Sequence, residues 1–170
     1  KRFALGTLWT NCYLVWNSDG DGFVVDPGGP AEEVENFIRE NDIHLHWIIL
    51  THGHSDHIGG IPDLKNISEN GVAVHYEDAE SLSNANKNLS AMLGASIELS
   101  APDRELKDND ILKVGTMTIK VIHTPGHTKG GCCYYVASEG VLFSGDTLFQ
   151  NSVGRTDFVN SSTSDLVHSV

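Results

Sequence analysis

The chain has 170 residues, of which 39% are hydrophobic and 20% charged, a composition typical of a globular protein. We expect a single domain over residues 1–170 with its own hydrophobic core. Its formal net charge of −12 disfavours binding to nucleic acid or to an anionic membrane surface, because both would repel the chain. No apolar run approaches the length of a membrane span, so we predict no membrane partner.

The three cysteines are an odd number without a CxxC pair, which indicates neither a disulfide framework nor a zinc knuckle. Cys132 and Cys133 are neighbours in a strand-like run, where adjacent side chains point to opposite faces. We expect buried free thiols and a reducing, cytoplasmic compartment. Residues 1–11 lack the apolar segment of a signal peptide, although the first residue, Lys1, leaves a removed leader open.

The chain begins with the pattern of a β-hairpin followed by a helix. Residues Asn11–Trp16 and 23–25 are rich in β-formers, and the polar and glycine residues between them are typical of a hairpin turn. Pro30 sets the first turn of a helix that extends to about Asn41. The apolar stripe of this helix is expected to pack on the sheet: Val34, Phe37 and Ile38.

Four side chains of the kinds that bind metal ions follow the apolar run Trp47–Leu50: His52, His54, Asp56 and His57. Imidazoles and carboxylates suit Zn²⁺, Fe or Mn. His52 and His54 can project to one side of an extended segment, whereas the adjacent Asp56 and His57 diverge unless the chain turns into a helix. One tetrahedral ion could hardly collect all four, so this spacing favours two ions a few ångströms apart.

Residues Thr51–His57 read THGHSDH, and two later stretches, His123–Thr128 and Gly145–Phe149, read HTPGHT and GDTLF. In this order they resemble the HxHxDH signature and the later motifs of the metallo-β-lactamase superfamily. The segment Gly154–Asp157 is similar to the glyoxalase II (hydroxyacylglutathione hydrolase) branch in particular. The resemblance implies an α/β fold, a four-layer αββα sandwich of two mostly antiparallel sheets with helices outside.

Other residues before the middle of the chain carry weaker signals. Asp26 precedes Pro and Gly, as a turn aspartate often does, and the resemblance implies that it supports the metal ligands from behind. His44 and His46 have no partner spacing, which favours solvated or strand-edge histidines over ligands. A helix is expected from Ile61 to about Asn70, then a strand over 72–75, and a helix followed by a loop within 77–103.

The second half of the chain predicts more strands that end in polar residues. A hairpin over 111–122 runs into His123 and His127, and strands over 132–136 and 141–144 lead to Asp146. Spacing alone does not choose between the two histidines. The resemblance selects His127 as a ligand and Asp146 as the carboxylate that bridges both ions, and a last helix follows Ser161–Asp165.

The first functional prediction is hydrolysis with two divalent ions, Zn first and Fe or Mn as alternatives. A water shared by two ions loses its proton near neutral pH and becomes a hydroxide nucleophile, with Asp56 and Asp146 as the catalytic carboxylates. The resemblance points to a small thioester such as S-(2-hydroxyacyl)glutathione as substrate. The alternatives are a mononuclear iron persulfide dioxygenase, using His52, His127 and Asp146, and a non-catalytic module stabilised by metal.

The resembling family supplies one further histidine to the second ion, well after the bridging aspartate. His168 is the only histidine downstream of Asp146, and it falls inside the expected last helix, where we expect it to be solvated or packed. The expectation is therefore that the C-terminal part of the usual domain is absent from this chain and that the second ion is the weaker one. The sequence does not indicate an oligomeric state.

Overall fold

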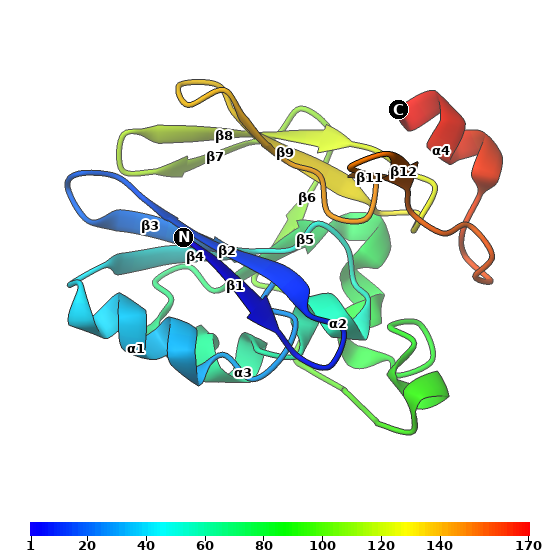
Figure 1. Ribbon diagram of the computed structural model, residues 1–170, viewed down its shortest axis with the longest axis horizontal. Helices are drawn as coiled ribbons and strands as arrows, with labels where there is room; N and C mark the ends of the chain where they lie inside the picture. The colour runs from blue at the N-terminus through cyan, green and yellow to red at the C-terminus, as the bar shows by residue number, and fades with distance from the viewer.

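Two β-sheets pack face to face in the computed structural model, which describes residues 1–170 (Figure 1). The first sheet has the order β1-β2-β3-β4-β5-β6: β1 (Arg2–Leu5), β2 (Thr10–Trp16), β3 (Asp21–Val25), β4 (His44–Ile49), β5 (Val72–His75) and β6 (Arg104–Leu106). The second has the order β10-β9-β8-β7: β7 (Ile111–Val114), β8 (Met117–His123), β9 (Cys132–Val136) and β10 (Val141–Phe143). A separate hairpin joins β11 (Leu148–Phe149) to β12 (Ser152–Val153).

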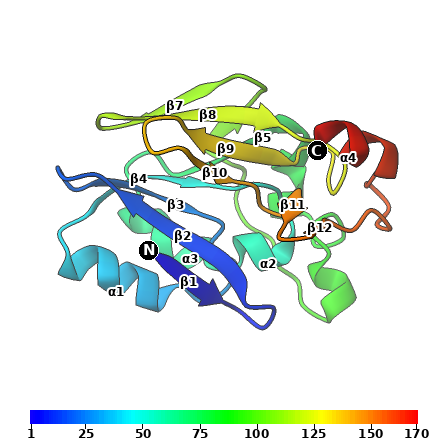
Figure 2. The ribbon, with the colours of Figure 1, turned by 45° about the horizontal axis from the view of Figure 1, so that its top comes forward.

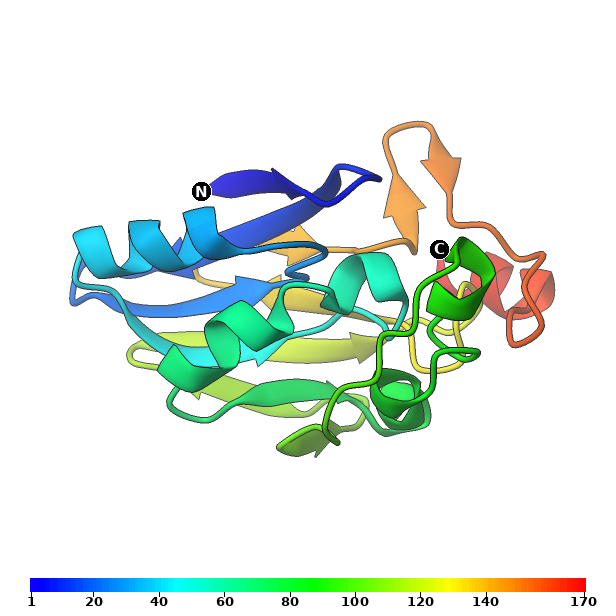
Figure 3. The ribbon, with the colours of Figure 1, turned by 90° about the horizontal axis from the view of Figure 1, so that it is seen from below.

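Helices lie outside the sheets. The α-helices are α1 (Glu32–Glu40), α2 (Ser55–Ile58), α3 (Ile61–Leu64) and α4 (Thr163–Ser169), and the 3-10 helices are η1 (Lys65–Ile67), η2 (Tyr76–Ser83) and η3 (Ser90–Leu93). Figures 1 and 3 show α1 and α3 over the outer face of the first sheet, and α4 at one end of the second. Figure 2 shows the second sheet lying across the other face of the first. The expected α/β architecture, with two facing sheets and external helices, is confirmed.

The first sheet is buried on both faces, and two hydrophobic clusters result. Because successive side chains of a strand point to opposite faces, Val24 joins the cluster under α1 and α3, while Phe23 and Val25 join the cluster between the sheets. The stripe expected on α1 is present, with Val34 and Ile38 buried and Phe37 packed against the same cluster. Together these clusters hold the strand ends in fixed positions.

The first sheet is mostly parallel, with two antiparallel and three parallel strand pairs, which corrects the expectation of two mostly antiparallel sheets. The β2–β3 hairpin is antiparallel as expected, but β3, β4, β5 and β6 run parallel to one another. The chain crosses over through α1 between β3 and β4 and through α2 and α3 between β4 and β5. Such crossovers return the chain to the same end of the sheet and so require parallel pairing.

Two expected helices are shorter or tighter than the sequence indicated. The helix expected from Ile61 to Asn70 ends within α3 and η1, because the backbone N–H groups of Glu69 and Asn70 donate instead to the carbonyls of Leu45 and His46. The helix expected after Glu77 is the 3-10 helix η2. None of the helices has the length and apolar character of a membrane span.

Four polar segments follow strands that end at the same edge of the molecule. They are Asp26 after β3, the residues after Leu50 behind β4, the loop after His123 behind β8, and Asp146 behind β10. The backbone N–H of Cys132 in β9 donates to the carbonyl of Thr51 over 2.8 Å and so ties the two sheets together beside these segments. The fold therefore brings side chains from distant parts of the sequence to one place.

Candidate metal centre

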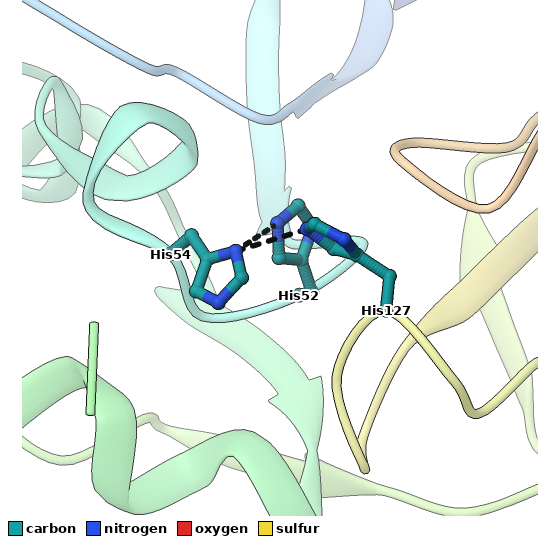
Figure 4. A group of neighbouring side chains, drawn as sticks. All are labelled: His52, His54 and His127. Carbon is teal, nitrogen blue, oxygen red and sulfur yellow. Dashed lines mark hydrogen bonds between the residues drawn. The ribbon is translucent and has the colours of Figure 1, made fainter. Parts of the chain in front are cut away.

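Three buried imidazoles converge at the end of β4. The Nε2 atoms of His52 and His127 lie 3.1 and 3.0 Å from Nδ1 of His54 (Figure 4). All three residues are buried, with at most 7% of their surface exposed. Nitrogens bound to one tetrahedral zinc ion at 2.0–2.1 Å would be about 3.3 Å apart, so this triangle has the size of a metal site.

A second group of donors lies beside the first and shares one carboxylate with it. Oδ1 of Asp146 is 3.4 Å from Nε2 of His57, and its Oδ2 is 3.5 Å from Nε2 of His127. Oδ2 of Asp56 lies 3.6 Å from the same His57 nitrogen. His52, His57 and Asp146 also form a group of donor atoms within 4.8 Å of one another. Asp146 thus stands between the two groups.

Local structure explains how one short segment serves both groups. His54 is the N-cap residue of α2, so its backbone is still extended, and Asp56 and His57 lie in the first turn of that helix. The backbone N–H of Ser55 donates to the carbonyl of the buried Asn88 over 2.8 Å, which holds the start of the helix. The sequence analysis expected the side chains of the adjacent Asp56 and His57 to diverge unless the chain turns into a helix, and the structure has this turn.

The ring nitrogens that face away from the centre also have neighbours. Nδ1 of His127 donates to the carbonyl of Arg155 over 2.8 Å. Nδ1 of His57 lies 3.0 Å from Oδ2 of Asp26, an ionic contact without the geometry of a hydrogen bond. Such outer partners fix the orientation of a ligating imidazole.

Asp26 is built into the site at some conformational cost. Its φ of 50° lies in the left-handed region, and it is only 2% exposed. Its carboxylate accepts from the backbone N–H of Thr51 over 2.7 Å and from the Thr51 hydroxyl over 2.6 Å. Gly145 approaches this threonine so closely that a Cβ there would lie 2.2 Å from the Thr51 hydroxyl oxygen. Strained residues of this kind persist where the surrounding structure determines them.

Asp78 connects the two ligand-bearing loops and was not identified from the sequence. Its carboxylate accepts from the backbone N–H of Gly53, between two of the imidazoles, over 2.9 Å, and from that of Gly130, just after His127, over 2.8 Å. The side chain is buried, and a Cβ on Gly130 would lie 2.7 Å from its Oδ1. A single acidic residue in an irregular segment gave no signal for this role.

Burial and charge set the protonation of the donors. Burial, with a contribution from His57, lowers the pKa of His52 well below its ordinary value, and burial followed by His127 lowers the pKa of His54 to about 3. Both are neutral at neutral pH, the form that binds metal ions. Burial alone would also lower the pKa of His57, but Asp26 and Asp146 outweigh it and raise that pKa well above its usual range.

Two cavities of about 460 Å³ each open onto the donors from different sides. One reaches Asp56, His57 and Asp146, with Trp9 and Phe149 among its apolar walls. The other reaches His54 and His127. Phe158 packs edge-on against both of these rings, with centroids 5.3 and 5.8 Å away. Cavities of this size take small molecules.

The remaining histidines lie apart from these donors. Nε2 of His123 donates to the carbonyl of Lys129 over 2.8 Å, and its ring stacks on that of His75 with a centroid separation of 4.1 Å. His168 is exposed in α4, where its Nδ1 donates to the carbonyl of Ser164. Both positions agree with the expectation that neither histidine joins the centre.

The three cysteines are buried and free, as expected from the sequence.

The donor sets fit divalent metal ions. The three imidazoles crowd one point, where Nδ1 of His54 faces the Nε2 atoms of both other rings at once. A cation at their centre would satisfy all three lone pairs. Imidazole and carboxylate donors together suit Zn²⁺, Fe and Mn.

Comparison with known proteins agrees with this geometry. A hydroxyacylglutathione hydrolase of Haemophilus influenzae, GloC, is 33% identical over 162 residues, which cover 94% of this chain and 76% of that protein. The structure of the BLEG-1 B3 metallo-beta-lactamase is 37% identical with a TM-score of 0.94, covering 99% of this chain and 82% of that one. TTHA1623, solved in a di-iron-bound form, is 30% identical with a TM-score of 0.86 over 99% of this chain and 83% of its own.

The resemblance seen in the sequence motifs is thereby confirmed. The family model of the metallo-beta-lactamase superfamily matches residues 6–170, nearly the whole chain. The histidine-rich donor groups are typical of the binuclear centres of that family, some of whose members bind two zinc or two iron ions. The chain belongs to the metallo-beta-lactamase superfamily.

Proposed function

We propose that this protein is a metal-dependent hydrolase that uses two divalent ions, Zn²⁺ first, to cleave a small thioester such as an S-(2-hydroxyacyl)glutathione. The observation that carries the proposal is the position of Asp146, with one carboxylate oxygen beside each donor group. A bridging carboxylate of this kind is needed only where two ions lie side by side.

The proposed ligands follow from the contacts. His52, His54 and His127 would hold the first ion, and Asp56 and His57 the second, with Asp146 shared. The near-equal distances of 3.4 and 3.5 Å from Asp146 to the two neighbouring imidazoles support the shared role. Asp26 would keep His57 oriented towards the second ion.

Two such ions would supply a hydroxide nucleophile near neutral pH and polarise the carbonyl group under attack. The chain's own contribution is to hold the six donors in place before substrate arrives. Asp26 and the carbonyl of Arg155 orient His57 and His127, and Phe158 shields one side of the imidazoles from water. Preorganised sites of this kind avoid rearrangement during the reaction.

A thioester suits this site for two reasons. A thiolate leaves with little need for protonation, so no side chain has to act as an acid. Lys87 and Lys129 line the cavity beside His54 and His127, and in a chain of net charge −12 they provide cations for a carboxylate of the substrate. The relative from Haemophilus influenzae is described as a hydroxyacylglutathione hydrolase, which agrees with this substrate class.

β-Lactam hydrolysis is a second candidate, favoured by the TM-score of 0.94 to a B3 metallo-beta-lactamase. Thioester and β-lactam hydrolysis can be measured on the same zinc-loaded preparation, with S-lactoylglutathione and a chromogenic cephalosporin as substrates. Oxygen uptake in the presence of glutathione persulfide tests the dioxygenase alternative. We expect kcat/KM for the thioester to exceed that for the cephalosporin by at least about a hundredfold, a preference of about 2.7 kcal/mol. Faster cleavage of the cephalosporin, or oxygen uptake, would overturn the assignment.

A further inference from the structure

A second cluster of histidines and carboxylates lies at the end of the first sheet opposite to the metal centre. It consists of Asp21 at the start of β3, His44 and His46 at the start of β4, and Glu69 after η1. The metal centre lies beyond the other ends of the same strands, where Asp26 follows β3 and the segment with His52 follows β4. In Figure 1 the β2–β3 turn and the start of β4 lie at the left, away from α2.

The parallel pairing of the strands brings these residues together. Asp21 is the register partner of His44, whereas His46 has no partner because the register between β3 and β4 shifts there. The imidazoles of His44 and His46 nevertheless lie side by side. The backbone N–H of Glu69 donates to the carbonyl of Leu45, the residue between the two histidines, over 2.9 Å. The β3–β4 pairing, with its bulge at His46, and the contact of Glu69 therefore bring all four side chains together.

Three of the donor atoms surround one point. Oδ1 of Asp21 lies 2.8 Å from Nε2 of His46 and 3.8 Å from Nδ1 of His44. The two imidazole centroids are 4.4 Å apart, and one donor from each of the three residues lies within 4.8 Å of the others. A tetrahedral zinc ion places its ligand atoms about 3.3 Å apart, a spacing that these distances bracket.

Glu69 occupies the position of an outer carboxylate. Its Oε2 is 2.9 Å from Nδ1 of His46 and 3.5 Å from Nε2 of His44, the two ring nitrogens that face away from Asp21. Ligating histidines commonly donate their second N–H to a carboxylate, which fixes both the tautomer and the ring orientation. In the structure Nε2 of His46 donates to Oδ1 of Asp21. With an ion bound, the N–H of each ring would instead face Glu69, and the two nitrogens nearest Asp21 would offer their lone pairs to the cation.

Asp21 is held firmly on its own side. Its backbone N–H donates to the side-chain oxygen of Asn17 over 2.9 Å. The β7–β8 turn packs on it at Gly115, where a Cβ would lie 2.0 Å from Asp21 Oδ2 and where φ is +52°. The contact with His46 lowers the pKa of Asp21, which keeps its carboxylate charged. A ligand that is already fixed loses little entropy when an ion binds.

We propose that Asp21, His44 and His46 form a separate binding site for a divalent transition metal ion, Zn²⁺ in the first instance, with Glu69 orienting both imidazoles. Two nitrogens and one carboxylate oxygen suit Zn²⁺, and His44, which is more exposed, leaves the remaining coordination position to water. The site would fasten the β2–β3 hairpin to β4 and the segment after η1. It does not depend on the hydrolase activity.

The test is a count of bound zinc. The purified chain is stripped with a chelator, titrated with Zn²⁺ by isothermal calorimetry, and compared with His46→Ala and with His168→Ala, a matched control that removes an exposed histidine outside both sites. We expect the parent chain and the control to bind about one Zn²⁺ more than His46→Ala. Equal numbers in all three, or an equal loss in the control, would overturn the site.

Glu69→Gln provides a variant that keeps every direct donor. It should retain the additional Zn²⁺ but bind it about 10–100-fold more weakly, the usual effect of losing an outer partner. Thioester hydrolysis by His46→Ala should equal that of the parent, and circular dichroism of the stripped variants verifies their folding. If the extra Zn²⁺ binds as described while thioester hydrolysis is absent, the site stands and only the proposed function fails. Unchanged affinity in Glu69→Gln would contradict the role of that carboxylate.

Discussion

Asp146→Ala should lower kcat/KM for the thioester by at least about a hundredfold, more than the 10–100-fold expected for an outer partner. The carboxylate reaches towards both donor groups, with its two oxygens 3.4 and 3.5 Å from His57 and His127. Removing this carboxylate takes one ligand from each proposed ion. It also removes the contact between Asp146 and His57. Steady-state kinetics, together with metal analysis of the same preparation, measures the effect.

His123→Ala is the matched control, because His123 also follows a strand beside the centre but faces the carbonyl of Lys129 and the ring of His75. It should keep its metal and nearly all of its activity. Loss of metal in the His123 variant together with retention in the Asp146 variant would reverse the assignment of the two residues.

Asp78→Ala should weaken both the fold and the metal centre. The change leaves the backbone N–H groups of Gly53 and Gly130 buried without an acceptor, at about 1–3 kcal/mol each and so about 2–6 kcal/mol of unfolding free energy in all. Since these glycines belong to the loops that carry His52, His54 and His127, affinity for the first ion should also fall, by about 10–100-fold. Chemical denaturation and chelator competition measure the two effects.

Asp103→Ala separates the effect on metal from a general loss of stability. Asp103 also accepts a backbone N–H, that of Val72 over 2.9 Å, and pairs with Lys65, but it touches neither ligand loop. We expect it to lower the unfolding free energy while zinc affinity stays at the parent value. Equal zinc affinity in the Asp78 variant and the parent would show that Asp78 only stabilises the fold.

Most of the proposed metal ligands could be picked out in the sequence because they lie close together in it. His52, His54, Asp56 and His57 lie within six positions, whereas His127 and Asp146 were selected by the resemblance and not by their spacing. Local patterns also predicted the β2–β3 and β7–β8 hairpins, whose partners are neighbours in the chain. In each case the information lies in a short segment.

Contacts between distant segments were not predictable in this way. The parallel pairing of β3 to β6 depends on how the crossover segments pack on the sheet, so no local sequence pattern predicts it. Asp78 meets glycines 25 and 52 residues away, and His46 meets Asp21 across 25 residues. His44 and His46 therefore read as unpartnered in the sequence, although the fold supplies them with two carboxylates.

The central claim, a centre of two ions that share Asp146, is tested most directly by metal removal. The chain is produced with Zn, Fe and Mn supplied together, its metals are counted, and a chelator is titrated against the parent and Asp56→Ala while bound metal and thioesterase activity are followed. We expect about two ions at the centre. They should be lost in two steps, because the first ion is held by three buried imidazoles and the second by more exposed carboxylates. Thioesterase activity should disappear in the first of these two steps. Asp56→Ala should lack the more easily removed ion. A single iron at the centre, or unchanged metal content in Asp56→Ala, would contradict the account.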